Sequence, residues 1–200
     1  MAFTYFFRDL QSLELSIDLL IPKTMGKSKI KLWDAGCASG QEPYSLAILL
    51  AEKMGEFSFR NVEITSTDID ISNQFEKIIQ EGIYSKGDLI RIPDNLFRKY
   101  FNLYSEKDQY QILEKIRKRL KYIRHDLLSL IPPDTGFSLI VCKNVLLHFN
   151  ESQRISVLKM FHSTLCGEGL LVMEHTQKLP DTLNHLFVPA YPNAQVYRKK

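Results

Sequence analysis

The segment Ile30–Tyr44, with the sequence IKLWDAGCASGQEPY, constrains the fold of this chain more than any other segment. It contains a short apolar run with an acidic residue near its end, two glycines four positions apart, and Glu42-Pro43 at the start of an apolar, helix-like stretch. A strand, a glycine turn and a helix in this order let a ligand lie against bare backbone at a helix N-terminus, beyond the carboxyl end of a parallel strand. The segment therefore predicts a ligand-binding crevice in an α/β domain.

The spacing of Gly36 and Gly40 indicates the class of ligand. A dinucleotide loop requires G-x-G-x-x-G, whereas this chain has Asp34-x-Gly36-x-x-x-Gly40 and lacks the glycine that a pyrophosphate needs. A loop that keeps glycines for close approach, with Asp34 before them, suits a nucleoside that carries a positive sulfonium and no phosphate. We therefore expect S-adenosylmethionine as the cofactor and S-adenosylhomocysteine as its product.

Length and composition favour one domain in a reducing compartment. The chain has 200 residues, 44% of them hydrophobic, and a net charge of +3, which is too small to indicate a nucleic-acid partner. Three scattered cysteines do not form a disulfide framework, so we expect a cytoplasmic protein. No apolar run approaches the roughly 18 residues that cross a bilayer. Asp9, Glu14 and Asp18 interrupt the apolar core that a signal peptide would need.

Apolar, strand-like runs alternate with helix-like stretches along most of the chain. The predicted strands are Lys29–Ala35, Val62–Thr67, Phe137–Cys142 and Leu170–Glu174, and the predicted helices are Glu42–Met54, Ser72–Glu81 and Glu151–Leu165. Asn150, followed by Gln153, is a capping pair for the last of these helices. The alternation predicts an α/β fold with a mostly parallel, twisted sheet and right-handed crossovers.

Two segments break this alternation. Thr4–Leu20 reads as one helix, which leads into the sheet through a linker at Pro22–Ser28; its predicted buried stripe is Phe6, Phe7, Leu10, Leu13, Ile17 and Leu20. Strand-like runs between Tyr100 and His125 predict a small antiparallel insertion. Six of the ten residues from Lys115 to Arg124 are Lys or Arg, so this insertion is either a solvated hairpin or a docking surface for an acidic protein segment.

Five motifs in order resemble those of the chemotaxis-receptor methyltransferases, the CheR family. They are Thr4-x-Phe6-Phe7-Arg8, Gly40-Gln41-Glu42-Pro43-Tyr44-Ser45, Thr67-Asp68-Ile69-Asp70, Gly82-Ile83-Tyr84 and Cys142-Lys143-Asn144-Val145. The resemblance spans Thr4 to about Tyr197. It implies a Rossmann-like, S-adenosylmethionine-dependent methyltransferase fold and methylation of glutamate side chains, giving methyl esters, on an acidic or glutamate-bearing protein such as a chemoreceptor.

The same resemblance suggests how the chain is divided. We expect an N-terminal helix and linker over residues 1–28, an S-adenosylmethionine-binding domain over 29–99 and 126–200, and an inserted β-subdomain over 100–125. The chain begins at the T-x-F-F-R motif, so we expect the family's N-terminal helical domain, which helps to engage receptor helices, to be missing. The sequence leaves the oligomeric state open.

The chemistry of this reaction predicts a site without a metal ion or a nucleophilic triad. Methyl transfer from a sulfonium to a carboxylate is an in-line displacement, and a glutamate with a pKa of roughly 4.3 is already ionised at neutral pH. No general base is required. The protein works mainly by alignment and desolvation, and orientation of the reactants lowers a barrier by roughly 7–11 kcal/mol.

Acidic side chains at strand and helix ends are the candidate cofactor ligands. Asp68 closes the second strand, where it can accept hydrogen bonds from the ribose hydroxyls or cap the next helix, although Asp70 is also available as a cap. Asp126 and Leu127 open a loop at the same sheet edge, and Asp126 can bond the adenine amino group where the family commonly has Asn. The resemblance places Glu42 among the cofactor contacts, and a helix-dipole role is compatible with that.

Arg8, Asn144 and His148 are the candidate catalytic residues. Arg8 can bind the methionine tail or the incoming glutamate bidentately, or it can be a surface arginine paired with Asp9. Asn144 follows the fourth predicted strand, where substrate and cofactor would meet, or it is a turn former. His148 stands where the family typically has a tyrosine; it can donate a hydrogen bond to a carboxylate, more strongly when protonated near pH 6.5.

The complete candidate site follows from these assignments. Thr4 is either a further cofactor contact or a helix cap. The predicted cofactor-binding residues are Thr4, Arg8, Gly36, Gly40, Glu42, Asp68, Asp126, Leu127, Asn144 and Val145. Two alternatives to a protein-carboxylate methyltransferase stay open: a methyltransferase for small molecules, and a catalytically weak adapter that binds the cofactor and docks a partner through the basic insertion.

Overall fold

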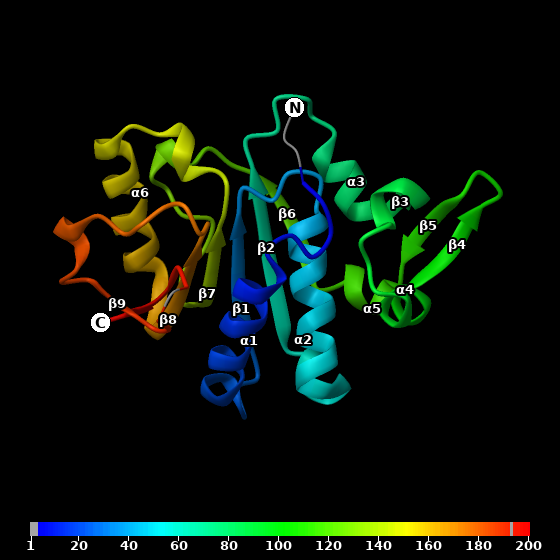
Figure 1. The fold of residues 1–200 in the computed structure, drawn as a ribbon, viewed down its shortest axis with the longest axis horizontal. Coiled ribbons are helices and arrows are strands. Elements are labelled where there is room, and N and C mark those ends of the chain that lie inside the picture. Colours follow the sequence, from blue (N-terminus) through cyan, green and yellow to red (C-terminus); the bar gives the residue numbers. More distant parts are fainter. Residues whose placement is uncertain (1–3, 193) are drawn as a thin grey trace.

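A seven-stranded sheet with helices on both faces forms the body of the computed structural model, which describes residues 4–192 and 194–200 (Figure 1). The first half of the chain contains α1 (Leu10–Thr24), β1 (Ile30–Ala35), α2 (Gln41–Phe59), β2 (Val62–Asp68), α3 (Phe75–Glu81), β3 (Ile83–Ser85), η1 (Lys86–Leu89), α4 (Asp94–Tyr100), β4 (Phe101–Ser105), β5 (Gln109–Ile112), α5 (Glu114–Arg117) and β6 (Leu120–Arg124). The second half contains η2 (Leu127–Ser129), β7 (Phe137–Cys142), η3 (Leu146–His148), α6 (Glu151–Thr164), β8 (Leu165–Met173), η4 (Asp181–Leu183), β9 (Phe187–Pro189) and β10 (Val196–Lys199).

The strand order in the large sheet is β6-β2-β1-β7-β8-β10-β9. Strands β6, β2, β1, β7 and β8 pair in parallel, and β10 pairs antiparallel with both β8 and β9. This arrangement confirms the predicted mostly parallel sheet and α/β class. Because the carboxyl ends of parallel strands share one edge, the loops that follow β1, β2, β6 and β7 meet there.

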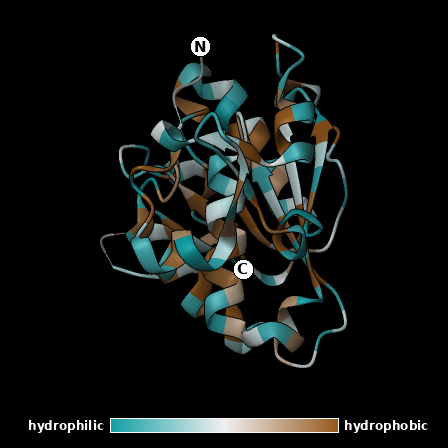
Figure 2. Ribbon diagram, turned by 90° about the vertical axis from the view of Figure 1, so that its right-hand side faces the viewer, coloured by the Kyte–Doolittle hydropathy of each residue, from teal (hydrophilic) through white to brown (hydrophobic). Residues whose placement is uncertain are grey.

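The central strands are buried on both faces. Along β1, Leu32 belongs to the core cluster that includes α1 and α2, whereas the next residue, Trp33, belongs to the cluster under α6. The Trp33 ring lies 5.1 Å from that of Phe161 and 5.4 Å from that of Phe137, centroid to centroid. Two-sided burial explains why the parallel strands read as continuous apolar runs in the sequence, and Figure 2 shows hydrophobic stretches along the strands and helices of the interior.

The N-terminal helix differs from the predicted one at both ends. It begins at Leu10, not Thr4, because Phe7 and Asp9 have left-handed backbone angles, with φ of 58° and 51°. It continues through Pro22 to Thr24, so the predicted linker is shorter than expected. All members of the predicted stripe lie in or against the core, with Leu10 only partly buried.

The small antiparallel sheet has the strand order β3-β5-β4, and Figure 1 shows it at one side of the molecule. One of its strands, Ile83–Ser85, comes from before the predicted insertion. The run Leu120–Arg124, which we assigned to the insertion, instead pairs in parallel with β2 as an edge strand of the large sheet. The basic segment 115–124 is therefore a helical turn and an edge strand, so its interpretation as part of a hairpin is wrong.

Helix and strand boundaries elsewhere shift for local reasons. Helix α2 extends to Phe59 across a break at Gly55, whose φ is 73°. Strand β8 begins at Leu165, five residues before the predicted start, with Gly167 and Gly169 inside it. The predicted capping pair at α6 is confirmed, because Asn150 and Gln153 bond each other's backbone N–H groups. Within residues 4–192 and 194–200, no helix combines the length and the apolar character needed to cross a bilayer.

Candidate active site

Two adjoining cavities lie among loops that follow the parallel strands. We call the larger one, of about 460 Å³, the Arg8 cavity; it is lined by Thr4, Arg8, Gly36, Ala38, Glu42, Asp68, Ile69, Lys143, Asn144, Val145, Leu147 and His148. We call the smaller one, of about 270 Å³, the Asp126 cavity; it is lined by Gly36, Thr67, Asp68, Ile69, His125, Asp126, Leu127, Leu128, Val145, His148 and Phe149. The shared residues make the two cavities one cleft. Every predicted site residue except Gly40 lines it.

The glycine loop is shaped by its neighbours as well as by any ligand. Gly36 and Gly40 have φ of +103° and +95°, which side chains rarely adopt. A Cβ on Gly36 would overlap the Cγ2 methyl of Val145, and one on Gly40 would lie 2.7 Å from Cγ1 of Ile79 and 2.9 Å from the hydroxyl of Tyr84. Gly36 still presents backbone to both cavities. The loop therefore needs its glycines for packing, a role that the sequence analysis did not assign.

Asp68 is fixed at the junction of the two cavities. Its carboxylate accepts hydrogen bonds from the backbone N–H groups of Ala38 and Asp70, each at 3.0 Å. The capping alternative belongs to Asp70, whose side chain accepts the N–H of Gln74 at 3.3 Å and of Phe75 at 2.9 Å. Each carboxylate oxygen accepts more than one hydrogen bond, so Asp68 retains capacity for ribose hydroxyls.

Asp126 begins the short helix η2 at the wall of its cavity. Its Oδ1 accepts the backbone N–H of Leu128 at 2.8 Å, which fixes the carboxylate orientation. Leu127 is buried in the core cluster under α6 and also lines the cavity. An acceptor and an apolar surface therefore stand side by side, which suits an adenine ring with its amino group.

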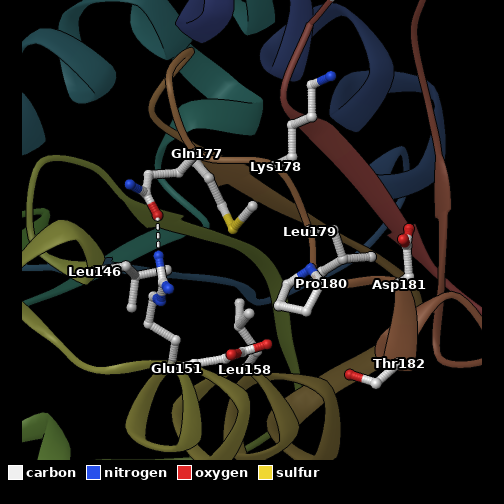
Figure 3. Close-up of a pocket in the computed structure, with 11 residues that line it drawn as sticks. Leu146, Glu151, Leu158, Gln177, Lys178, Leu179, Pro180, Asp181 and Thr182 are labelled. Carbon is white, nitrogen blue, oxygen red and sulfur yellow. Dashed lines mark hydrogen bonds between the residues drawn. The ribbon is translucent and has the colours of Figure 1, made fainter.

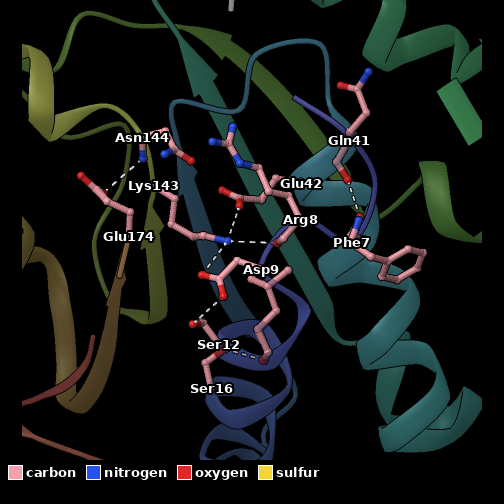
Figure 4. Close-up of polar contacts among 12 residues, drawn as sticks. Phe7, Arg8, Asp9, Ser12, Ser16, Gln41, Glu42, Lys143, Asn144 and Glu174 are labelled. Carbon is pink, nitrogen blue, oxygen red and sulfur yellow. Dashed lines mark hydrogen bonds and ion pairs between the residues drawn. The ribbon is translucent and has the colours of Figure 1, made fainter. Parts of the chain in front are cut away.

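Lys143 is buried behind the Arg8 cavity and joins three segments. Its ammonium Nζ lies 3.0 Å from Oε2 of Glu42 and 3.5 Å from Oδ2 of Asp9, and it donates to the backbone oxygen of Arg8 at 3.2 Å (Figure 4). Only 2% of its side chain is exposed. Although burial opposes its charge, Glu42 and Asp9 raise the pKa of Lys143 above its ordinary value. Lys143 belongs to the motif Cys142-Lys143-Asn144-Val145, but nothing in the sequence pattern marks it as a site residue.

Two further acids, Asp34 and Glu174, are buried near this lysine. The side chain of Asp34 is buried without a hydrogen-bond partner on either oxygen among the described residues. Burial raises its pKa well above the ordinary value, and the charge of Glu42 adds to the effect. Glu174 accepts the backbone N–H of Asn144 at 3.1 Å, and burial raises its pKa too. Glu174 is not among the predicted site residues, although its place at the end of the predicted strand Leu170–Glu174 is a signal of the same kind as that of Asp68.

The candidate catalytic residues come from the turn before α1 and from the loop that follows β7. Asn144 has a left-handed backbone, with φ of 59°, so it forms a turn and also lines the Arg8 cavity. The guanidinium of Arg8 lies 5.7 Å from the Tyr5 ring centroid. Asp9 is engaged by Lys143 and Ser12. Thr4 lies well before the start of α1, which excludes it as that helix's cap. His148 ends η3 and lines both cavities.

The carboxylates of the cleft suit the predicted cofactor. Glu42, Asp68 and Asp126 supply carboxylates in the wall. Carboxylates accept hydrogen bonds from ribose hydroxyls and favour the positive charges of a sulfonium and an ammonium, whereas they repel phosphate. These residues therefore fit S-adenosylmethionine.

A separate cavity of about 450 Å³ lies between α6 and the chain that follows β8. Its lining includes Arg154, whose guanidinium donates to the side-chain oxygen of Gln177 at 3.0 Å (Figure 3). None of the predicted site residues lines this cavity.

Comparisons with known proteins identify the family of this chain. The family model for the CheR methyltransferase SAM-binding domain matches residues 2–192. A chemotaxis protein methyltransferase of Borreliella burgdorferi is 33% identical over 190 residues, which cover 90% of this chain and 66% of that protein. A chemotaxis protein methyltransferase of Listeria innocua is 30% identical, over 91% of this chain and 70% of that protein. The chain thus spans about two thirds of the length of these relatives.

Among solved structures, that of the DszA carbon methyltransferase superposes with a TM-score of 0.50 at 18% identity, over 82% of this chain and 33% of that one. This likeness supports the fold alone. The fold, the motif series and the family match confirm the predicted Rossmann-like methyltransferase fold and its cofactor. The chain belongs to the CheR family of S-adenosylmethionine-dependent methyltransferases.

Proposed function

We propose that this chain transfers a methyl group from S-adenosylmethionine to the side-chain carboxylate of glutamate on a chemoreceptor-like or other signalling protein, and so forms a methyl ester. The observation that carries the proposal is one cleft in which Asp68 and His148 line both cavities and Arg8 and Asn144 line the Arg8 cavity. The names of the relatives, chemotaxis protein methyltransferases, support a receptor as the acceptor. We propose the cytoplasm as the location, which suits three unpaired cysteines.

The two cavities suggest how the cofactor lies. In the proposed arrangement, Asp68 accepts hydrogen bonds from the ribose, Asp126 and Leu127 hold the adenine, and the methionine portion enters the Arg8 cavity. The residues assigned to that last portion are Thr4, Glu42, Asn144 and Val145, with Gly36 at the junction, and Arg8 is assigned to the acceptor. Gly40 shapes the loop instead of touching the ligand. When bound, S-adenosylmethionine supplies a methyl group on a positively charged sulfur.

The side chains of the chain then have to bind and align the acceptor. A glutamate with a pKa of roughly 4.3 enters as a carboxylate, so no residue needs to remove a proton. The guanidinium of Arg8 can bind both carboxylate oxygens, which orients the nucleophile. His148 can donate a further hydrogen bond, and Asn144 can fix the position of the reacting groups. Such orientation supplies roughly 7–11 kcal/mol of barrier lowering without acid or base catalysis.

The nature of the labelled product tests the proposal. The chain is incubated with S-adenosylmethionine labelled in its methyl group and with a purified cytoplasmic fragment of a chemoreceptor from the same organism. We expect label on the fragment that is released as volatile methanol at high pH, because esters hydrolyse in base. A fragment whose candidate glutamates are replaced by alanine is the matched control.

Other outcomes distinguish the alternatives. Base-stable label on protein, or label only in small molecules, would contradict the assignment of glutamate as acceptor. Binding of S-adenosylhomocysteine without any transfer would favour an adapter over an enzyme.

A further inference from the structure

The ammonium group of Lys143 makes its contacts with other parts of the protein. A lysine ammonium carries three N–H donors. In this structure it faces three protein oxygens, from Glu42 at 3.0 Å, the Arg8 backbone at 3.2 Å and Asp9 at 3.5 Å. These contacts, one hydrogen bond and two ion pairs, tie Lys143 to protein groups, although part of its side chain reaches the cavity wall.

The three partners of Lys143 come from two other segments of the chain. Asp9 and Arg8 belong to the turn that precedes α1, Glu42 lies in the first turn of α2, and Lys143 itself follows β7 (Figure 4). Each of these segments contributes a lining residue to the Arg8 cavity. A single buried side chain thus connects all three segments that form one end of the cleft.

The turn at residues 4–9 contains two residues in an unfavourable backbone conformation, so contacts with other segments help to hold it. Phe7 and Asp9 have left-handed angles, which are unfavourable for residues other than glycine. Asp9 precedes α1 without giving the helix a side-chain cap. Two hydrogen bonds join the turn to other segments: the Phe7 N–H donates to the Ser45 hydroxyl at 2.8 Å, and Lys143 donates to the Arg8 backbone oxygen.

We propose that Lys143 is a positioning residue for the methionine end of the cofactor site: it holds the turn that carries Thr4 and Arg8 against the start of α2 and keeps the Glu42 carboxylate in place. This inference rests on the proposed placement of the cofactor. It does not depend on the identity of the methyl acceptor, since its test uses ligand binding alone.

Two ligands distinguish positioning from a general loss of structure. In the proposed placement, S-adenosylhomocysteine occupies both cavities, whereas 5′-methylthioadenosine lacks the amino-acid tail that enters the Arg8 cavity. Calorimetric titration of the whole chain with each ligand is carried out on the wild type, Lys143→Met and Lys143→Arg. We expect Lys143→Met to lower the affinity for S-adenosylhomocysteine about tenfold, the size of one lost charged hydrogen bond. The affinity for methylthioadenosine should change less than twofold. Lys143→Arg keeps the charge and should restore most of the affinity.

Asp9→Asn provides a milder variant in case Lys143→Met does not fold. It weakens the attachment of the turn and leaves the contact between Lys143 and Glu42 intact. We expect a several-fold loss of S-adenosylhomocysteine affinity and faster hydrogen exchange at the amides of residues 4–9. Lys53→Met is the matched control, because Lys53 also joins α1 to α2, through Asp18 at 2.6 Å, but lines neither cavity of the cleft.

The results can overturn the inference in two ways. Equal losses for both ligands in the folded variants would mean that Lys143 acts on the whole domain. Unchanged affinity for S-adenosylhomocysteine in Asp9→Asn, with unchanged exchange at residues 4–9, would show that the turn does not need this anchor.

Discussion

The Cγ2 methyl of Val145 lies where a Cβ on Gly36 would have to be, so the loops after β1 and β7 interlock side chain against backbone. Gly36 also has a φ of +103°, which disfavours any side chain. We therefore expect Gly36→Ala to lower the free energy of unfolding by about 1–3 kcal/mol, measured by urea denaturation. The double variant Gly36→Ala/Val145→Ala lacks the Cγ2 methyl of residue 145. It should therefore relieve the overlap but not the backbone strain at residue 36.

Gly87→Ala is the control for this prediction. Gly87 does not have a left-handed backbone, and its nearest neighbour would lie 3.7 Å from the new Cβ. The free energy of unfolding of Gly87→Ala should differ from that of the wild type by less than about 0.5 kcal/mol. Equal stability of Gly36→Ala and the wild type would show that the two loops separate easily.

Asp68→Ala should abolish measurable cofactor binding. The loss of charged hydrogen bonds to two ribose hydroxyls, each worth about 1.5–3 kcal/mol, lowers affinity by roughly a hundredfold or more. Calorimetry with S-adenosylhomocysteine measures the effect. Asp70→Ala is the comparison, since Asp70 caps α3; it should lower stability by about 0.5–2 kcal/mol and affect affinity only a few-fold. Normal binding by Asp68→Ala would refute the ribose assignment.

Arg8→Ala should separate binding from turnover. If the guanidinium orients the incoming carboxylate, its removal leaves the affinity for S-adenosylhomocysteine within a few-fold and lowers the rate of methyl transfer about a hundredfold, as for other lost charge-stabilising donors. Arg8→Lys keeps the charge but lacks the guanidinium that can bind a carboxylate bidentately. Its rate of methyl transfer should lie between those of the wild type and Arg8→Ala. Rates come from the methyl-label assay at saturating cofactor. A loss of affinity equal to the loss of rate would place Arg8 on the cofactor alone.

Glu174 should make the stability of the free protein fall with rising pH. Burial raises the pKa of Glu174 above its ordinary value of 4.5 in the folded chain. Between the pKa of Glu174 in the unfolded chain and its higher pKa in the folded chain, the folded state binds more protons than the unfolded state. The free energy of unfolding therefore decreases as pH rises through that window. Glu174→Gln keeps an acceptor for the Asn144 N–H and removes the titration. It should therefore be stabilising relative to the wild type at pH 7 and much less so at pH 4.

Urea unfolding at both pH values measures this difference. Glu106→Gln, in the exposed turn between β4 and β5, is the matched control and should shift stability alike at the two pH values. An equal effect of Glu174→Gln at pH 4 and pH 7 would contradict the assignment of the pH dependence to Glu174.

Most of the fold and the outline of the cleft could be predicted because their signals are local. A buried strand that ends at Asp68, or two residues before Asn144, places a polar residue at the carboxyl edge, wherever that strand lies in the sheet. The loops then converge through the parallel topology. This is why the predicted residues line one cleft although the sequence does not give the strand order.

Features that depend on distant partners could not be predicted. Lys143 is a site residue only because Asp9 and Glu42 reach it from other segments. Likewise, Phe7 leaves the helical conformation where its N–H meets the Ser45 hydroxyl, so α1 begins later than its apolar periodicity indicates.

The edge strand β6 shows the limit of strand patterns. Leu120–Arg124 has a strand-like composition, but composition does not tell which sheet a strand joins. Pairing with β2 places the loop that bears Asp126 beside Asp68, whereas a hairpin in the small sheet would have moved it away. The site thus depends on a pairing that the sequence alone did not reveal.

A structure of the chain with S-adenosylhomocysteine tests the central claim most directly. We predict that the ribose hydroxyls donate to the Asp68 carboxylate, that the adenine lies beside Asp126, and that the amino-acid tail lies in the Arg8 cavity. Density for the ligand in the separate cavity at Arg154 and Gln177, or a ribose that makes no contact with Asp68, would contradict it.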